Sequence, residues 1–238
     1  MNTILHIDTS GPDALIGISQ DLKIIASKQN SQSNTHGEFV QAGVDELFRD
    51  SATQLKDIDA IGVTMGPGSY TGLRVGLASA KGLAFALNKP LIGLSTLTLL
   101  AKAAVGHLTA TENPLVNEKQ LQVFSMIDAR RMEIFGAIYN SSLEYLAAEK
   151  AMILDEALLH ALLSNGPLIC IGSGVAKTKI LTQHADFQNS SPLFLDCSYT
   201  IHDMAALAMI KFKAADFEDL AYSGPAYLKD YYQKPLIK

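Results

Sequence analysis

Three apolar runs near the start of the chain decide the fold. Residues 3–28 read TILHIDTSGPDALIGISQDLKIIASK. The runs lie at residues 3–8, 14–19 and 23–28, and the short connections between them consist mostly of polar, Gly or Pro residues. Because such short connections join neighbouring antiparallel strands, the sequence predicts a three-stranded meander.

Helices and strands alternate after the meander. Val40, Val44 and Leu47 share one face of a helical pattern at residues 35–48. The pattern then predicts a strand at 59–65, a helix at 72–87, a strand at 91–94 and a helix at 96–105. The predicted order of this half is therefore βββαβαβα.

The second half of the chain repeats this order. Strands are predicted at 120–128, 132–139, 143–147, 167–171 and 193–195, and helices at 155–163, 175–182 and 202–213. Two α/β lobes, each a five-stranded mixed sheet with helices, resemble the actin/Hsp70/sugar-kinase superfamily. We expect a first lobe at residues 1–105 and a smaller second lobe at 106–238, with the helix near 202–213 packing back on the first.

Composition excludes several classes of protein. The net charge of −5 argues against a chain that binds nucleic acid unaided, because phosphate binding needs a basic stripe. No apolar stretch is long enough to predict a signal peptide or a membrane span. Cys170 and Cys197 lie in apolar surroundings, which predicts reduced, buried thiols and a cytoplasmic protein.

The turn after the first strand is a candidate anion site. Asp8, Thr9 and Ser10 could face a phosphate or approach a metal ion, together with Gly66 and Gly68 of a second glycine-rich loop. The alternative is that Asp8 only caps its own turn. The loop itself has neither the Walker nor the GxGxxG spacing.

Small residues recur along the helix that follows this loop. Gly72, Gly76, Ala80 and Ala84 are four residues apart, so they lie along one side of it. Another helix could approach this side closely, while Arg74 is spaced to reach solvent or a partner.

Other polar positions point less clearly to chemistry. Arg130, at the end of the first strand of the second lobe, could reach into a cleft or toward a partner, or stand in a solvated turn. Gly172–Ser173–Gly174 could be a nucleotide-facing loop or an ordinary strand-to-helix turn. The six histidines include no i, i+4 pair typical of zinc sites, and no local motif indicates a serine hydrolase.

Several segments together are similar to the TsaB (YeaZ) family. They are ILHIDTS at 4–10, a helix containing His36, GPGSYTGLRVGL at 66–77, AKGLAFALNKPLIGLSTL at 80–97, IDARRMEIF at 127–135 and PAYLKD at 225–230. The resemblance spans the chain, and the motifs at 66–77 and 127–135 are highly specific. Two departures are Tyr70, where phenylalanine is common, and Lys229, where arginine is frequent, which puts a bidentate contact in doubt.

The resemblance implies a non-catalytic subunit in the synthesis of N6-threonylcarbamoyladenosine in tRNA. Such a subunit docks on TsaD, works with TsaE, forms a homodimer when alone and meets tRNA only within the complex. It requires no cofactor, although weak ATP or ADP binding is left open. The helices at 35–48 and 72–87 are expected to form the docking surface through His36, Val40, Val44, Gly72, Arg74, Gly76, Ala80 and Ala84.

The resemblance also bears on catalysis. TsaD-type sequences carry an HxxxH metal motif after the segment that matches KPLIGLST, and its two positions fall on Thr96 and Leu100 here. Leucine cannot bind a metal, so we expect the catalytic metal to be missing. The competing hypothesis is an ATPase, kinase or metallopeptidase-like enzyme that uses the cleft between the lobes.

Overall fold

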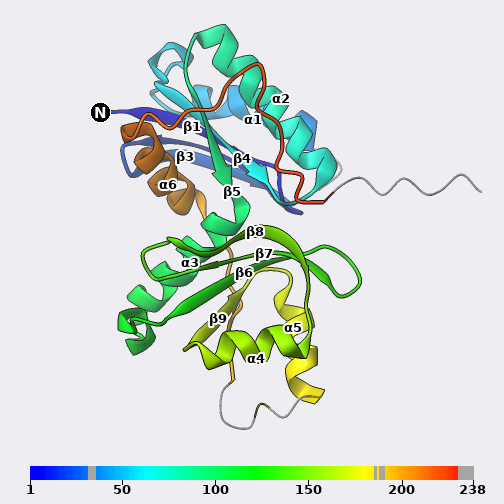
Figure 1. Ribbon diagram of the computed structural model, residues 1–238. Helices are drawn as coiled ribbons and strands as arrows, with labels where there is room; N and C mark the ends of the chain where they lie inside the picture. The colour runs from blue at the N-terminus through cyan, green and yellow to red at the C-terminus, as the bar shows by residue number, and fades with distance from the viewer. Residues whose placement is uncertain (32–35, 185–186, 188–190, 230–238) are drawn as a thin grey trace, which may run out of the picture.

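Figure 1 shows the protein as two lobes stacked on one another. The computed structural model describes residues 1–31, 36–184, 187 and 191–229. The first half contains β1 (Thr3–Asp8), β2 (Ala14–Gln20), β3 (Lys23–Asn30), α1 (His36–Asp50), η2 (Leu55–Asp57), β4 (Ala60–Gly66), α2 (Tyr70–Leu87), β5 (Leu91–Ser95), α3 (Thr96–Ala110) and η3 (Pro114–Asn117). The second contains β6 (Gln122–Asp128), β7 (Glu133–Tyr139), β8 (Tyr145–Ile153), α4 (Glu156–Ser164), β9 (Leu168–Ile171), α5 (Val175–His184), β10 (Leu193–Leu195) and α6 (Ile201–Lys213).

The two sheets have the same topology, which confirms the predicted α/β fold. The first has strand order β3-β2-β1-β4-β5, and the second has the equivalent order β10-β9-β6-β7-β8. In each sheet the first two connections are antiparallel hairpins, and the remaining strands join in parallel after helices. The element order βββαβαβα therefore occurs twice, as expected.

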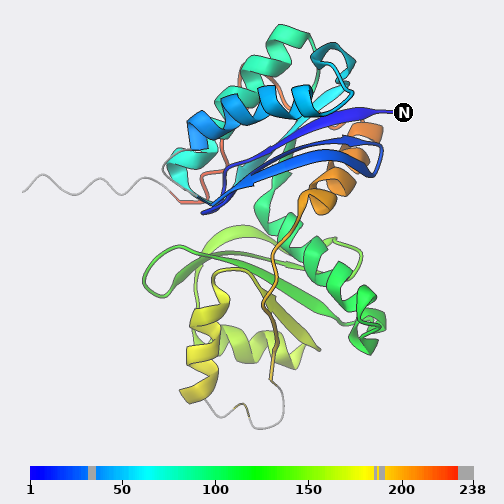
Figure 2. The same cartoon turned by 180° about the vertical axis from the view of Figure 1, so that it is seen from behind.

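Helices cover both faces of each sheet. In the first lobe, α1 and α2 pack on one face and α6 packs on the other; Figure 2 shows α1 and α6 on opposite sides of the strands. In the second lobe, α4 and the start of α5 share a core with one face, and α3 packs on the other. Strands enclosed on both faces are apolar throughout, which is why residues 3–8 read as a nearly continuous apolar run.

Two helices pack on the lobe that the other half of the chain builds. Residue 105, where we expected the first lobe to end, lies inside α3, which packs against β6, β7 and β9 of the second sheet. In return α6 packs against the first sheet. The division into units at 1–105 and 106–238 stays a prediction.

Most predicted elements differ from the structure only at their ends. The helix predicted at 72–87 begins earlier, at Tyr70, because the Ser69 hydroxyl accepts a hydrogen bond from the Gly72 amide and caps the helix. The predicted start of α1 at Thr35 lies outside the described residues. Residues 106–119, between the helix predicted at 96–105 and the strand predicted at 120–128, include the last turn of α3 and η3. None of the helices in the described ranges is long and apolar enough to cross a membrane.

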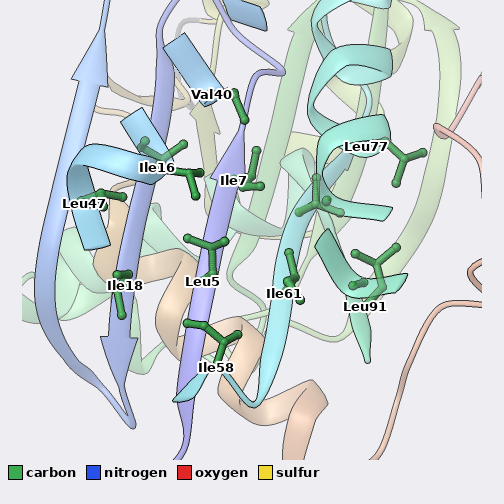
Figure 3. Packing of buried hydrophobic residues seen from close by; sticks show 14 residues of the cluster. Leu5, Ile7, Ile16, Ile18, Val40, Leu47, Ile58, Ile61, Leu77 and Leu91 are labelled. Carbon is green, nitrogen blue, oxygen red and sulfur yellow. The ribbon is translucent and has the colours of Figure 1, made fainter. Parts of the chain in front are cut away.

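The core of the first lobe is aliphatic. Figure 3 shows Leu5, Ile7, Ile16 and Ile18 of the central strands beneath α1 and α2. The alternate residues of β1 point to the opposite face, toward α6, and His6 is one of them. This rigid double-sided packing fixes the ends of β1 and β4, where the candidate site lies.

Candidate functional site

A cleft of about 880 Å³ lies between the lobes. Its walls come from the β1–β2 turn, the starts of α2 and α3, the β9–α5 turn and the segment before α6. Residues on these walls include Ser10, Gly68, Ser69, Thr96, Leu100, Asp128, Ser173, Lys179 and Tyr199. Of the five predicted anion-site residues, Ser10 and Gly68 line the cleft, whereas Asp8, Thr9 and Gly66 are not among its lining residues.

The Asp8 carboxylate accepts hydrogen bonds from three other parts of the chain. Its Oδ1 accepts hydrogen bonds from the Ser10 amide at 2.8 Å and the Thr64 hydroxyl at 2.7 Å. Its Oδ2 accepts one from the Tyr199 hydroxyl at 2.7 Å. Asp8 as a whole is only 3% exposed, so these donors satisfy its carboxylate inside the protein. Of the two alternatives, the turn cap describes this geometry, extended by contacts to β4 and to the segment before α6.

Tyr199 is the partner that sequence reasoning missed. Burial raises the pKa of its hydroxyl well above the usual value. The same hydroxyl lies 2.9 Å from Ser10 Oγ, so the Tyr199 side chain contacts both Asp8 and Ser10. A tyrosine 191 residues from Asp8 carries no local signal for this role.

The glycine-rich loop packs directly on the β1–β2 turn. The Ser69 amide donates to the Ser10 carbonyl at 2.7 Å. A Cβ atom at Gly68 would lie 2.4 Å from that same carbonyl oxygen. Only glycine allows this approach, so the loop serves packing here, while its outer surface still borders the cleft.

The two positions that match the HxxxH metal ligands of TsaD-type sequences line the cleft, but their side chains are not good metal ligands. Thr96 and Leu100 both line it. The Thr96 hydroxyl is buried and has no hydrogen-bond partner among the described residues, but one alcohol beside a leucine is a poor donor set for a transition metal. Within the described part of the chain, no three His, Cys, Asp or Glu side chains gather where a metal could bind. The residues present do not fit a catalytic metal.

The predicted interface residues on α2 face the wrong way, and this is a correction. Gly72, Gly76, Ala80 and Ala84 are buried inside the lobe. A Cβ atom at Gly72 would lie 2.0 Å from the Thr9 carbonyl oxygen, and one at Gly76 would lie 2.2 Å from Thr9 Oγ1. The Thr9 hydroxyl also donates to the Gly72 carbonyl at 2.7 Å. The close approach that small residues permit is therefore used by the protein's own β1–β2 turn.

Helix geometry explains why the small-residue row faces the inside of the lobe. Successive residues on an α-helix are about 100° apart. The row beginning at Gly72 is thus next to the leucine row of Leu73 and Leu77, which is also buried, and not opposite to it. Both rows form one inward face.

The predicted α1 residues are corrected in the same way. His36, Val40 and Val44 are all buried, and Val40 and Val44 belong to the core of the first lobe. A ring nitrogen of His36 lies 3.2 Å from the Gly11 carbonyl, which ties the start of α1 to the β1–β2 turn. Among the eight predicted interface residues, Arg74 alone is exposed.

The outward face of α2 is small and apolar. Ala78 and Gly82 are exposed, and nothing lies within 4 Å of a Cβ atom built at Gly82. Phe85 on the same face is 80% exposed. A phenylalanine this exposed beside small residues is an apolar surface of the kind that protein interfaces bury.

A C-terminal segment runs alongside α2. Figure 1 shows it passing from α6 over the first lobe and down beside α2. Lys81 Nζ donates to the Ser223 carbonyl at 2.7 Å, and the Ala226 amide donates to the Met65 carbonyl at 2.8 Å. Lys229 then forms an ion pair with Glu133 of the second lobe, and this contact lowers the pKa of Glu133. Residues 225–229 of the PAYLKD motif are thereby anchored to both lobes.

The second-lobe candidates divide between the cleft and its mouth. Asp128 and Ser173 line the cleft, and Ser173 Oγ accepts a hydrogen bond from the Asp128 amide at 2.9 Å. The Lys177 ammonium, 2.8 Å from Asp128 Oδ1, lowers the pKa of that carboxyl. Arg130 is exposed at the tip of the β6–β7 hairpin and is not one of the cleft-lining residues.

The two cysteines differ. Cys170 is fully buried on β9, as predicted, and burial raises the pKa of its thiol to about 12. Cys197 is only partly buried and lines the cleft, so the prediction that it is buried was wrong. It lies in the segment that connects β10 of the second lobe to α6, and the residues of this segment form part of the cleft wall.

Comparison with known proteins identifies the relatives of the chain. A family model described as TsaD, tRNA N6-adenosine threonylcarbamoyltransferase, matches residues 23–236. The tRNA threonylcarbamoyladenosine biosynthesis protein TsaB of Bacillus subtilis is 30% identical over 71% of this chain and 70% of its own length. TsaB of Escherichia coli is 29% identical over 72% of this chain and 71% of its own length.

Other comparisons agree on the fold. An uncharacterized protein of Mycobacterium tuberculosis H37Rv is 33% identical over 58% of this chain, and the match spans 60% of that relative's length. A solved structure of YeaZ from Pseudomonas aeruginosa superposes with a TM-score of 0.74 at 22% identity and covers 96% of this chain and 100% of its own. A second Pseudomonas structure, described as similar to peptidase YeaZ, superposes with a TM-score of 0.77 at 22% identity and equal coverage. At this identity, the structural likeness shows the fold.

Proposed function

Since the chain belongs to the TsaB family, we propose that it is a subunit of the machinery that makes N6-threonylcarbamoyladenosine in tRNA. The match to TsaB proteins over about 70% of their length carries this proposal. The partner we propose is a TsaD-type threonylcarbamoyltransferase, which shares the family model with this chain. TsaE, a homodimer of the isolated chain, tRNA contact within the complex and a cytoplasmic location belong to the same proposal.

We propose further that the subunit does not catalyse the transfer. In support, the cleft presents Thr96 and Leu100 where an HxxxH pair would hold a metal. Asp8, the carboxylate nearest to a catalytic role, has both oxygens occupied by internal donors. None of these three residues offers a strong metal ligand or a general base to a substrate.

The outward face of α2 is the docking surface we propose in place of the small-residue row. Ala78 and Gly82 let a partner helix approach closely, and Phe85 offers a large side chain that docking would bury. The exposed side of neighbouring α1 carries a net negative charge: Glu38, Asp45, Glu46 and Asp50 are exposed beside Arg49, and Lys28 of β3 pairs with Glu46 and Asp50. A partner with an apolar helix edged by basic residues would complement both helices.

Substitution on the outward face of α2 tests the docking surface. Phe85→Asp and Ala78→Arg should leave the monomer folded and abolish association with the TsaD-type partner in a pull-down and in sedimentation. Ile210→Asp is the matched control, because Ile210 is a similarly exposed apolar residue on helix α6. Retained association in the α2 variants, or equal loss in the control, would refute this surface.

Reconstitution tests the role itself. Modification of tRNA is measured with the TsaD-type enzyme, TsaE and the adenylate-forming enzyme, with and without this chain. We expect modification to be lost on omission and absent when this chain replaces the TsaD-type enzyme. Modification by this chain alone would show that it is an enzyme.

A further inference from the structure

Two consecutive arginines occupy strained backbone at the tip of the β6–β7 hairpin. Arg130 has φ 69° and Arg131 has φ 50°, and both side chains are exposed. Glycine and asparagine are the residues usually found in this left-handed region, and other residues there cost free energy. A tip that carries two arginines in place of those residues points to a function for the side chains.

A second exposed group, which we call the aromatic platform, consists of Tyr70 and Arg74 of α2 and Tyr227 of the C-terminal segment. The Arg74 guanidinium lies 4.1 Å from the centre of the Tyr70 ring and donates through Nε to the Tyr227 hydroxyl at 2.9 Å. The two tyrosine rings are 5.4 Å apart, and they are 45% and 50% exposed. The Ala226–Met65 backbone bond holds the tyrosine-bearing segment in place. The platform is thus preorganised and open to solvent in the isolated chain, and it borders the proposed docking surface, because Arg74 lies one helical turn before Ala78.

One ion pair joins the platform to the hairpin. Lys229, two residues after Tyr227, contacts Glu133, two residues after Arg131. Lys229 and, less strongly, Arg131 lower the pKa of Glu133. Figure 1 shows the C-terminal segment ending on the side of the molecule where this hairpin protrudes. Arginine tip and tyrosine platform therefore form one surface.

The charge of this surface is positive. Its acidic groups, Asp128 and Glu133, are each paired with a lysine, Lys177 and Lys229 respectively. Within the described ranges, Arg130 and Arg131 form no ion pair, so their charge faces solvent. Free guanidinium groups beside exposed rings are the combination that binds phosphates and stacked bases of single-stranded RNA.

We propose that the Arg130–Arg131 tip and the Tyr70–Arg74–Tyr227 platform contact an unpaired segment of the tRNA substrate. This inference rests on the proposed function, because the chain's overall charge is too negative for it to hold RNA at physiological salt without a partner; at low salt, where phosphate contacts strengthen, we expect weak binding by the isolated chain. The arginines contact phosphates, and a ring of the platform stacks on a base. The surface adds affinity and orientation to a tRNA held mainly by the partner enzyme.

The test measures tRNA affinity of the assembled complex over a range of salt concentrations. The variants are Arg130→Glu/Arg131→Glu, Tyr227→Ala and Tyr227→Phe. The control, Lys56→Glu/Lys119→Glu, makes the same change of charge at exposed lysines just before β4 and β6, at the strand ends away from the cleft. Co-purification with the partner is measured for each variant first.

We expect the arginine variant to bind tRNA about tenfold more weakly, and the magnitude of its log–log salt slope to fall by about 1.4 for two lost phosphate contacts. Tyr227→Ala should lose about tenfold, the scale of one stacked base, whereas Tyr227→Phe keeps the ring and most of the affinity. The control should change affinity less than twofold. Equal effects in tip and control variants, or an unchanged salt slope, would overturn the proposal.

Failure of the proposed function gives a different result. If the wild-type chain does not assemble with the TsaD-type partner, that function is wrong. The same variants are then compared for tRNA binding by the isolated chain at low salt. Binding that depends on the arginines supports the RNA surface, and its absence overturns it.

Discussion

Replacing Gly72 by alanine should destabilise the fold, although alanine is the better helix former. The added Cβ atom would lie 2.0 Å from the backbone carbonyl oxygen of Thr9. That oxygen belongs to the β1–β2 turn, which the Asp8 and Ser69 hydrogen bonds hold in place, so it cannot move aside at low cost. The substitution must separate α2 from the turn.

The magnitude follows from three contributions. Overpacking a well-packed site costs about 1–3 kcal/mol. Shifting the helix also weakens the Thr9–Gly72 hydrogen bond of 2.7 Å, a net loss of about 1 kcal/mol. Alanine regains about 1 kcal/mol through helix propensity. The expected net loss in free energy of unfolding is about 2 kcal/mol.

Gly82→Ala is the matched control in the same helix. Nothing lies within 4 Å of its added Cβ atom, so only the propensity gain of about 1 kcal/mol remains. The two variants should therefore differ by about 3 kcal/mol, or about 6–12 °C in Tm for a chain of this size. Thermal and urea unfolding followed by circular dichroism measures both. If Gly72→Ala were as stable as Gly82→Ala, the inward placement of the glycine row would be wrong.

Three further predictions concern buried groups. Burial lowers the pKa of His6 to about 3, so folding loses stability as the pH falls below the unfolded value of about 6.5, by about 2 kcal/mol at pH 5. Urea unfolding at pH 7.5 and pH 5 should show a smaller loss in His6→Gln, and an identical pH dependence would contradict this assignment. Tyr199→Phe removes the 2.7 Å hydrogen bond to Asp8 and should lower the free energy of unfolding by about 1–3 kcal/mol; an unchanged urea midpoint would show that the bond contributes nothing. The Cys170 thiol, buried and with its pKa raised to about 12, should react with a thiol reagent only as fast as the protein unfolds, measured in a Cys197→Ser variant because Cys197 is partly exposed in the cleft; rapid labelling of that variant in its native state would contradict the burial of Cys170.

The order of helices and strands was predictable because its signals are local. Apolar runs such as residues 3–8, and turn residues such as Gly11 and Pro12, act through neighbours along the chain. Element ends moved by a few residues where a cap decided them, as Ser69 does for α2. The repeated order then sufficed to predict two equivalent sheets.

The direction in which a residue faces was less predictable. Gly72 and Gly76 indicate that another segment packs closely against α2. The sequence pattern does not say whether that segment belongs to a partner or to the chain's own β1–β2 turn. In the sequence, Phe85 looks like an ordinary core residue of a helix. Only the structure shows that its side chain is exposed to solvent.

The sequence by itself determined the elements, their order and the family, because those depend on periodicity and on motifs within short stretches. Only the tertiary structure decided that the Tyr199 hydroxyl donates a hydrogen bond to the Asp8 carboxylate. It further decided that α3 packs on the sheet of the second half and α6 on the sheet of the first half. It also decided that Tyr227 joins Arg74 across 153 residues of chain. These outcomes depend on which distant segments meet in space, and no local pattern of residues carries that information.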